Sequence, residues 1–150
     1  MTARLWFVRD RYGDGELERM ASRTPAVRAL VTQPPLPFVW CPFGDMIDVD
    51  RAIFEGPMKR EPRKMGEFGG AIAKHDLPTI YKVLFKIGTP DGRVRVVQTG
   101  TTFPRYFCEL GVCGWFEAAV ELSGGKNVRV DHSACRHEGA PNCEWLVKWT

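Results

Sequence analysis

Apolar residues recur at helical spacing through much of the first two thirds of the chain. Over residues 45–55 they fall on one face of a helix, at Met46, Ile47, Val49, Ile53 and Phe54. Over residues 77–87 a second stripe is formed by Ile80, Val83, Leu84 and Ile87. The spacing predicts an amphipathic helix over 45–55 that ends at Gly56-Pro57, and a core helix over 77–87.

Shorter elements are predicted from local signals near the N-terminus. Residues 5–10 form a short apolar segment that we expect to pack on the core, and the Gly-Asp-Gly run at 13–15 predicts a turn. A short helix is predicted over 16–22. A threonine followed by proline is typical of a helix start, so another helix is predicted over 25–31.

Near the C-terminal end the pattern changes to alternation, which predicts strands over 93–98, 127–134 and 144–149. The loop between the last two is too long for a two-residue turn, so we expect an antiparallel pair with a longer connection. A helix is predicted over 111–122. The predicted fold class is α+β, a single domain over residues 1–150 with an N-terminal helical layer packed on a small antiparallel C-terminal sheet.

The alternation also predicts which large side chains face inward. Trp145, Val147 and Trp149 fall on one side of the last strand, and Trp115 falls on the apolar side of the helix before the sheet. We therefore predict that these three tryptophans are mostly buried.

Composition narrows the classes of function. The chain has 150 residues with 21 basic and 18 acidic side chains, a net charge of +3, and no basic run that would follow a phosphate backbone. Nucleic acid is therefore not expected as a partner. No apolar stretch reaches the ~20 residues that span a bilayer, and the N-terminus has no secretory pattern, so we expect a cytoplasmic protein without membrane insertion. For that compartment we expect the five cysteines to be thiols or metal ligands before disulfides.

The strongest chemical signal is a pair of cysteines, Cys135 and Cys143, that flank a glycine-containing loop between the last two strands. His132 lies on the incoming strand. These three side chains can converge on one ion with bonds of about 2.0–2.3 Å, as zinc requires. Two other interpretations stay open: the cysteines are buried thiols that fill space, or they form a disulfide or redox pair. His137 is expected to be solvated, and His75 to lie at a helix end.

This region resembles the 4-vinyl-reductase small-molecule-binding domain family, a relative of the haem/nitric-oxide-binding associated modules and of the trafficking-complex (TRAPP) subunit fold. The likeness rests on Gly114-Trp115, on a helix that ends at Gly125, and on the order strand, cysteine, glycine loop, cysteine, strand over residues 128–149. The preceding residues resemble that family only in their general arrangement, a helical layer before a sheet.

The resemblance implies a ligand set for zinc. In sensor members of that family four side chains hold the ion, and the matching positions here are Cys108, His132, Cys135 and Cys143. A histidine stands where those sensors usually have glutamate, and Cys113 is the rival of Cys108. A closed set of four thiolate and imidazole ligands is structural rather than catalytic.

The resemblance also implies a pocket for a small apolar or aromatic molecule between the helices and the sheet. Its candidate lining residues are aromatic: Trp40, Tyr81, Phe85, Tyr106 and Trp115. The simpler explanation is that these side chains fill the core of the domain.

No catalytic residue is assigned, because the sequence has no glycine-rich phosphate loop, no His-Glu-x-x-His and no Gly-x-Ser-x-Gly elbow. We expect a non-catalytic, small-molecule-binding or regulatory module. The alternatives are a dimeric scaffold that resembles trafficking-complex subunits and, third, an enzyme of tetrapyrrole or phenolic metabolism. A homodimer is expected from the resemblance and from the helix predicted over 63–74, whose small residues let two backbones approach. The same residues could instead pack within the chain.

Overall fold

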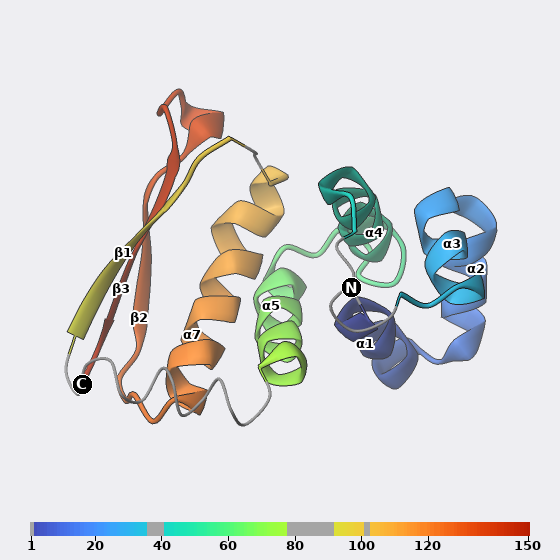
Figure 1. The fold of residues 1–150 in the computed structure, drawn as a ribbon, viewed down its shortest axis with the longest axis horizontal. Helices are drawn as coiled ribbons and strands as arrows, with labels where there is room; N and C mark the ends of the chain where they lie inside the picture. The colour runs from blue at the N-terminus through green and yellow to red at the C-terminus, as the bar shows by residue number, and fades with distance from the viewer. Residues whose placement is uncertain (1, 36–40, 78–91, 101–102) are drawn as a thin grey trace. The chain divides into compact units, whose positions relative to one another are not determined.

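The computed structural model describes residues 2–35, 41–77, 92–100 and 103–150. These residues form six α-helices and one three-stranded antiparallel sheet, which confirms the α+β class (Figure 1). The core helix predicted over 77–87 lies almost wholly outside the described residues, as do Trp40, Tyr81 and Phe85. No described helix is long and apolar enough to cross a membrane.

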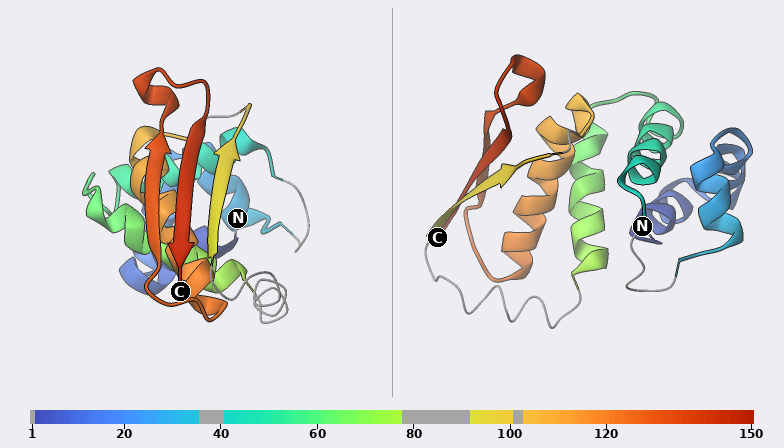
Figure 2. Two further views of the ribbon diagram at one scale, coloured as in Figure 1. Left: turned by 90° about the vertical axis from the view of Figure 1, so that its left-hand side faces the viewer. Right: turned by 45° about the horizontal axis from the view of Figure 1, so that its top comes forward.

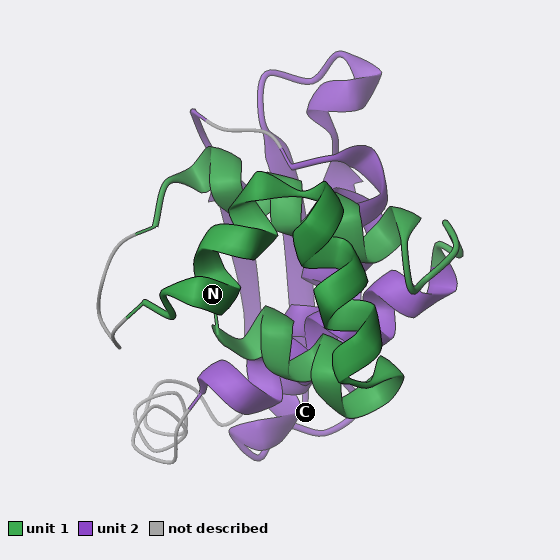
Figure 3. Cartoon of the chain, turned by 90° about the vertical axis from the view of Figure 1, so that its right-hand side faces the viewer, with its two compact units in different colours: residues 1–62 green, residues 63–150 purple. Residues whose placement is uncertain are grey.

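The chain divides into two compact units, residues 1–62 and 63–150 (Figure 3). The first unit is helical and consists of α1 (Thr2–Tyr12), α2 (Asp14–Arg23), α3 (Pro25–Thr32) and α4 (Phe43–Glu55). The last three match the helices predicted from the sequence, whereas α1 was expected only as an apolar segment. Gly13, with φ of 83°, separates α1 from α2 in a backbone conformation that glycine adopts readily, so the predicted turn is confined to that residue.

The core of the first unit draws apolar side chains from all four helices, among them Phe7, Val8, Leu17, Met20, Val27, Val49 and Ile53. It also contains a buried ion pair between Arg4 on α1 and Asp50 on α4. Arg4 donates from Nε and Nη2 to the two carboxylate oxygens, over 2.7 and 3.2 Å. Two buried charges are tolerated here because each satisfies the other.

The second unit begins with α5 (Arg63–Asp76) and β1 (Gly92–Gln98). A π-helical turn (Phe107–Gly111) leads directly into α7 (Val112–Leu122), and the unit ends with β2 (Arg129–Ala134), a 3₁₀ turn (Arg136–Glu138) and β3 (Cys143–Trp149). The predicted helices over 63–74 and 111–122 and the three predicted strands are therefore all confirmed, with ends shifted by a few residues.

The last strand of the sequence is the central strand of the sheet. The order is β1-β3-β2, with β3 antiparallel to both neighbours (Figure 2). Trp145 and Val147 are buried on the face that packs on α7, as predicted. Trp149 and Trp115 are only half-buried, so the expectation of three mostly buried tryptophans is confirmed for Trp145 and is too strong for the other two.

Glycines let the backbone of α5 touch the π-helical turn and the start of α7. A Cβ atom added at Gly69 would lie 1.8 Å from the carbonyl oxygen of Gly111, and one added at Gly114 would lie 2.1 Å from that of Gly66. No side chain fits at either position, because real Cβ atoms essentially never approach an oxygen so closely. The small residues expected to support a dimer therefore serve packing within the chain.

Candidate metal centre

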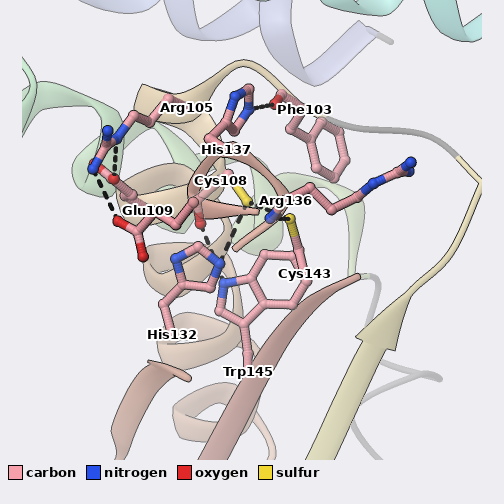
Figure 4. A network of polar contacts seen from close by, with 10 residues as sticks. Phe103, Arg105, Cys108, Glu109, His132, Arg136, His137, Cys143 and Trp145 are labelled. Carbon is pink, nitrogen blue, oxygen red and sulfur yellow. Dashed lines mark hydrogen bonds and ion pairs between the residues drawn. The ribbon is translucent and has the colours of Figure 1, made fainter. Parts of the chain in front are cut away.

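Four side chains from separate elements meet at one end of the sheet: Cys108, His132, Cys135 and Cys143. Their three sulfur atoms and one imidazole nitrogen all lie within 4.8 Å of one another. The three cysteines are buried and His132 is partly exposed. Figure 4 shows Cys108, His132 and Cys143 pointing toward one another from the π-helical turn before α7, from β2 and from β3.

Local backbone features bring these side chains together. The π-helical turn carries Cys108, whose backbone N–H bonds to the carbonyl oxygen of Pro104. A π-helical turn holds one more residue per turn than an α-helix, so it changes the direction in which its side chains point. In β2 the pairing with β3 shifts between His132 and Ala134, and such a bulge commonly redirects a side chain.

The loop between β2 and β3 is closed on itself next to the cysteines. The carbonyl oxygen of Cys135 accepts hydrogen bonds from the backbone N–H groups of Glu138 and Ala140. Gly139 follows the 3₁₀ turn with φ of 90°, in the left-handed region that glycine tolerates. This compact turn returns the chain so that Cys143 lies beside Cys135.

The sulfur atoms are close but not bonded to one another. The Sγ atoms of Cys108 and Cys143 are 3.3 Å apart, and Cys108 Sγ is 3.6 Å from His132 Nε2. All five cysteines of the chain are free thiols. The backbone N–H of Arg136 donates to Cys143 Sγ over 3.4 Å, a contact that also suits a thiolate.

The electrostatics of the cluster favour a cation. Burial, followed by the neighbouring sulfurs of Cys143 and Cys135, raises the pKa of the Cys108 thiol far above its usual value. Three thiolates cannot share this space unless a positive charge lies between them, and a bound metal ion supplies that charge. Burial lowers the pKa of His132, which favours the neutral imidazole that coordinates metal ions.

Trp145 supports two of the four side chains. Its ring stacks on the imidazole of His132 with centroids 5.0 Å apart and planes 10° apart. Its indole N–H donates to the carbonyl oxygen of Cys108 over 3.2 Å. Trp145 is 1% exposed, so its ring is fixed by the core and holds both neighbours in place.

A second set of contacts ties the β2–β3 loop to the segment before α7. Arg105 pairs with Glu109 at 2.5 Å and with Glu138 at 3.0 Å. His137, expected to be solvated, is exposed but also hydrogen-bonds through Nε2 to the carbonyl oxygen of Phe103 over 2.8 Å (Figure 4). The supporting roles of Trp145 and Arg105 were not predicted, because they depend on strand register and on contacts distant in sequence.

The other candidate residues lie elsewhere or outside the described residues. Cys113, the rival of Cys108, is not part of the cluster. Among the proposed pocket residues only Tyr106 and Trp115 are described, and both are half-buried. Trp115 packs edge-on against Phe116, which lies 6.2 Å from Trp145 between ring centroids. These contacts are those of a core, and whether the aromatics also bind a ligand stays a prediction.

The fold is similar to that of two solved structures of an H-NOX protein. Two crystal structures of an H-NOX protein from S. oneidensis, one in the Fe(II)NO ligation state and one a mutant in the Fe(II) state, align with the whole chain. For both the TM-score is 0.58 and the identity 12%, with coverage of 99% and 96% of their own chains. At this identity the likeness shows the fold alone. No family model matches the chain and no curated protein matches its sequence, so the 4-vinyl-reductase resemblance stays a prediction.

Proposed function

We propose that the protein is a non-catalytic, small-molecule-binding regulatory module whose C-terminal unit holds a structural zinc ion. The observation that carries the metal proposal is the convergence of three sulfurs and one imidazole nitrogen within 4.8 Å. Three cysteines and one histidine are a common ligand set for structural zinc, and a closed set leaves no position open for a reacting water.

Zinc suits this cluster better than the iron(II) named for the structural neighbours. Soft thiolate ligands in a tetrahedral set favour zinc, whereas isolated iron sites commonly use imidazole. The chain has only three histidines. His132 belongs to the cluster, His137 is bonded to Phe103, and His75 lies beside Asp76 at the end of α5. The iron chemistry of the neighbours is therefore not proposed for this chain.

Metal analysis of the purified protein tests the zinc proposal. We expect one zinc per chain by inductively coupled plasma mass spectrometry, and tetrahedral cobalt–thiolate absorption after replacement by Co²⁺. Cys135→Ser removes one ligand and should lower the metal content sharply. Cys113→Ser is the matched control, since this half-buried cysteine lies outside the cluster, and it should keep full occupancy.

Two results would refute this proposal. One is wild-type protein that takes up neither zinc nor cobalt after reduction. The other is equal metal content in the Cys135→Ser and Cys113→Ser variants. Competition of the wild-type protein with a chromogenic chelator gives the affinity without any variant, so the test does not depend on a variant that folds poorly.

The H-NOX-like fold supports the small-molecule part of the proposal, since one of the two similar H-NOX structures is in the Fe(II)NO ligation state. The ligand class that we propose here is a small apolar or aromatic molecule, with Tyr106 and Trp115 as described lining candidates. Native mass spectrometry of protein purified without added ligand reports bound mass directly. Saturable quenching of tryptophan fluorescence by such a ligand should be reduced by Trp115→Leu, and an unchanged titration would exclude this residue from the site.

We further propose a reducing, cytoplasmic location, which the unpaired state of all five cysteines supports. The homodimer and the scaffold alternative now depend on the family resemblance alone, because the glycines of α5 contact Gly111 and Gly114 of the same chain. A stable dimer would bury ~1,200 Å² or more in total. Light scattering at micromolar concentration distinguishes a monomer from a homodimer. A monomeric mass would refute both the homodimer and the scaffold alternative.

A further inference from the structure

The face of the sheet that points away from α7 carries a row of three cations. Arg93 on β1 and Arg129 on β2 both lie directly opposite Lys148 on the central strand. Adjacent strands are about 4.8 Å apart, so the row crosses the whole sheet at one end. All three side chains are exposed. The left view of Figure 2 shows this face with the three strands in front of α7.

Neighbouring carboxylates neutralise this face only in part. Lys148 lies 3.7 Å from Asp131, and Arg95 forms two hydrogen bonds with Glu144 over 2.9 and 2.7 Å. Among the described residues neither Arg93 nor Arg129 has an ion pair. Like charges placed directly opposite each other destabilise a sheet, and Asp131 offsets only the charge of Lys148 in this row.

At one end the row reaches β1, which is an edge strand of the sheet. The edge of β1 that faces away from β3 is unpaired among the described residues. β1 pairs with β3 along its full length, and no other described strand pairs with it. Val94 and Val97 point to opposite faces of β1 and are 46% and 42% exposed. An edge strand of this kind presents free N–H and C=O groups that another strand can extend.

We propose that β1 accepts a strand from a partner protein, and that this strand alternates acidic and apolar residues. One of its carboxylates would lie beside Arg93 on the outer face, since Arg95 is already paired with Glu144, and its apolar side chains would cover Val94 and Val96 on the inner face. The backbone hydrogen bonds provide affinity, and the charges select the partner.

The charges around β1 disfavour three other partners at this edge: a second copy of β1, a phosphate backbone and an anionic membrane. If two copies of β1 paired in full-length antiparallel register, Arg95 would lie opposite Arg95, and like charges in that position repel. A phosphate backbone or an anionic membrane would cover the whole outer face and would meet the carboxylates of Asp131 and Glu144 as well as the cations. An acidic strand added at the edge meets Arg93 first, which has no ion pair among the described residues.

The test uses the full chain and two short fluorescein-labelled peptides, one alternating glutamate with valine and the other lysine with valine. Fluorescence anisotropy should show saturable binding of the acidic peptide and binding weaker by roughly tenfold or more for the basic one. Arg93→Glu should reverse this preference. Arg23→Glu, which changes an exposed arginine of α2 in the other unit, is the control and should change neither affinity.

Amide hydrogen exchange then distinguishes strand addition from adhesion to a charged surface. Strand addition should protect alternate backbone amides of β1, because only every second N–H points toward the new strand. Binding without protection of β1, equal binding of both peptides, the absence of binding, or self-association of the protein through β1 would each overturn the proposal. Circular dichroism of Arg93→Glu checks its folding, and a gain of affinity for the basic peptide cannot come from a folding defect.

Discussion

Replacing Gly69 by alanine should loosen the contact between α5 and the start of α7. The added Cβ would lie 1.8 Å from the carbonyl oxygen of Gly111, 2.8 Å from its carbonyl carbon and 3.0 Å from the backbone nitrogen of Trp115. All three are backbone atoms, so no side chain can rotate away. The two segments must therefore move apart, and the contacts beside the new methyl group are lost.

The matched control is Gly66→Ala on the same helix, where an added Cβ meets nothing closer than the carbonyl oxygen of Leu110 at 3.8 Å. Alanine favours the helix by about 0.8–1 kcal/mol over glycine at both positions, so this effect cancels in the comparison. What remains is the cost of overpacking, about 1–3 kcal/mol or more. Gly66→Ala should be neutral or slightly stabilising, and Gly69→Ala should be clearly destabilising relative to it.

Urea denaturation followed by tryptophan fluorescence measures the difference in the free energy of unfolding. The melting temperature of Gly69→Ala should be roughly 2–12 °C below that of Gly66→Ala, since 1 kcal/mol shifts it by about 2–4 °C in a chain of this size. If Gly69→Ala is as stable as Gly66→Ala or more so, α5 and α7 do not touch through their backbones. The glycines of α5 would then not serve close packing within the chain.

Three further predictions concern other parts of the molecule. Trp145→Ala should lower the free energy of unfolding by about 3–5 kcal/mol, and a loss below ~1 kcal/mol in urea would show that its strand face is exposed. Asp50→Ala leaves the buried charge of Arg4 without its partner and should cost about 3–5 kcal/mol by the same assay, whereas an unchanged melting curve would contradict a buried pair. Burial, followed by nearby carboxylates, raises the pKa of Cys113 to about 11. The rate of its alkylation by iodoacetamide, measured by peptide mass spectrometry, should therefore rise roughly tenfold per pH unit up to that value. A rate that reaches a plateau at neutral pH would refute the raised pKa.

Apolar periodicity predicts a helix where the stripe along its buried face is unbroken. The helix over 45–55 was predicted because its apolar residues follow one face. The helix α1 was not, since one of its buried positions is Arg4, a charge that is tolerated only because Asp50 pairs with it. A buried ion pair interrupts the apolar stripe on both helices, and the sequence does not reveal that two such residues will meet.

For the candidate metal cluster too, some residues could be predicted from the sequence and others could not. Spacing along one loop was enough to propose His132, Cys135 and Cys143, because two adjacent strands bring nearby residues together. The choice between Cys108 and Cys113 required the structure, since an added residue in the π-helical turn alters the phase of every side chain around it. The stacking of Trp145 on His132 required the pairing register of β2 with β3.

The position of β3 in the middle of the sheet has a consequence for the order in which the unit folds. β2 and β3 are joined by one short loop, so they can pair as a hairpin within microseconds. β1 precedes α7 in the chain and must wait until that hairpin exists, because its only described partner is the last strand. Closing the long intervening segment costs entropy before any pairing is gained. β1 is therefore the last strand to join the sheet and, on the reverse path, the first to leave it.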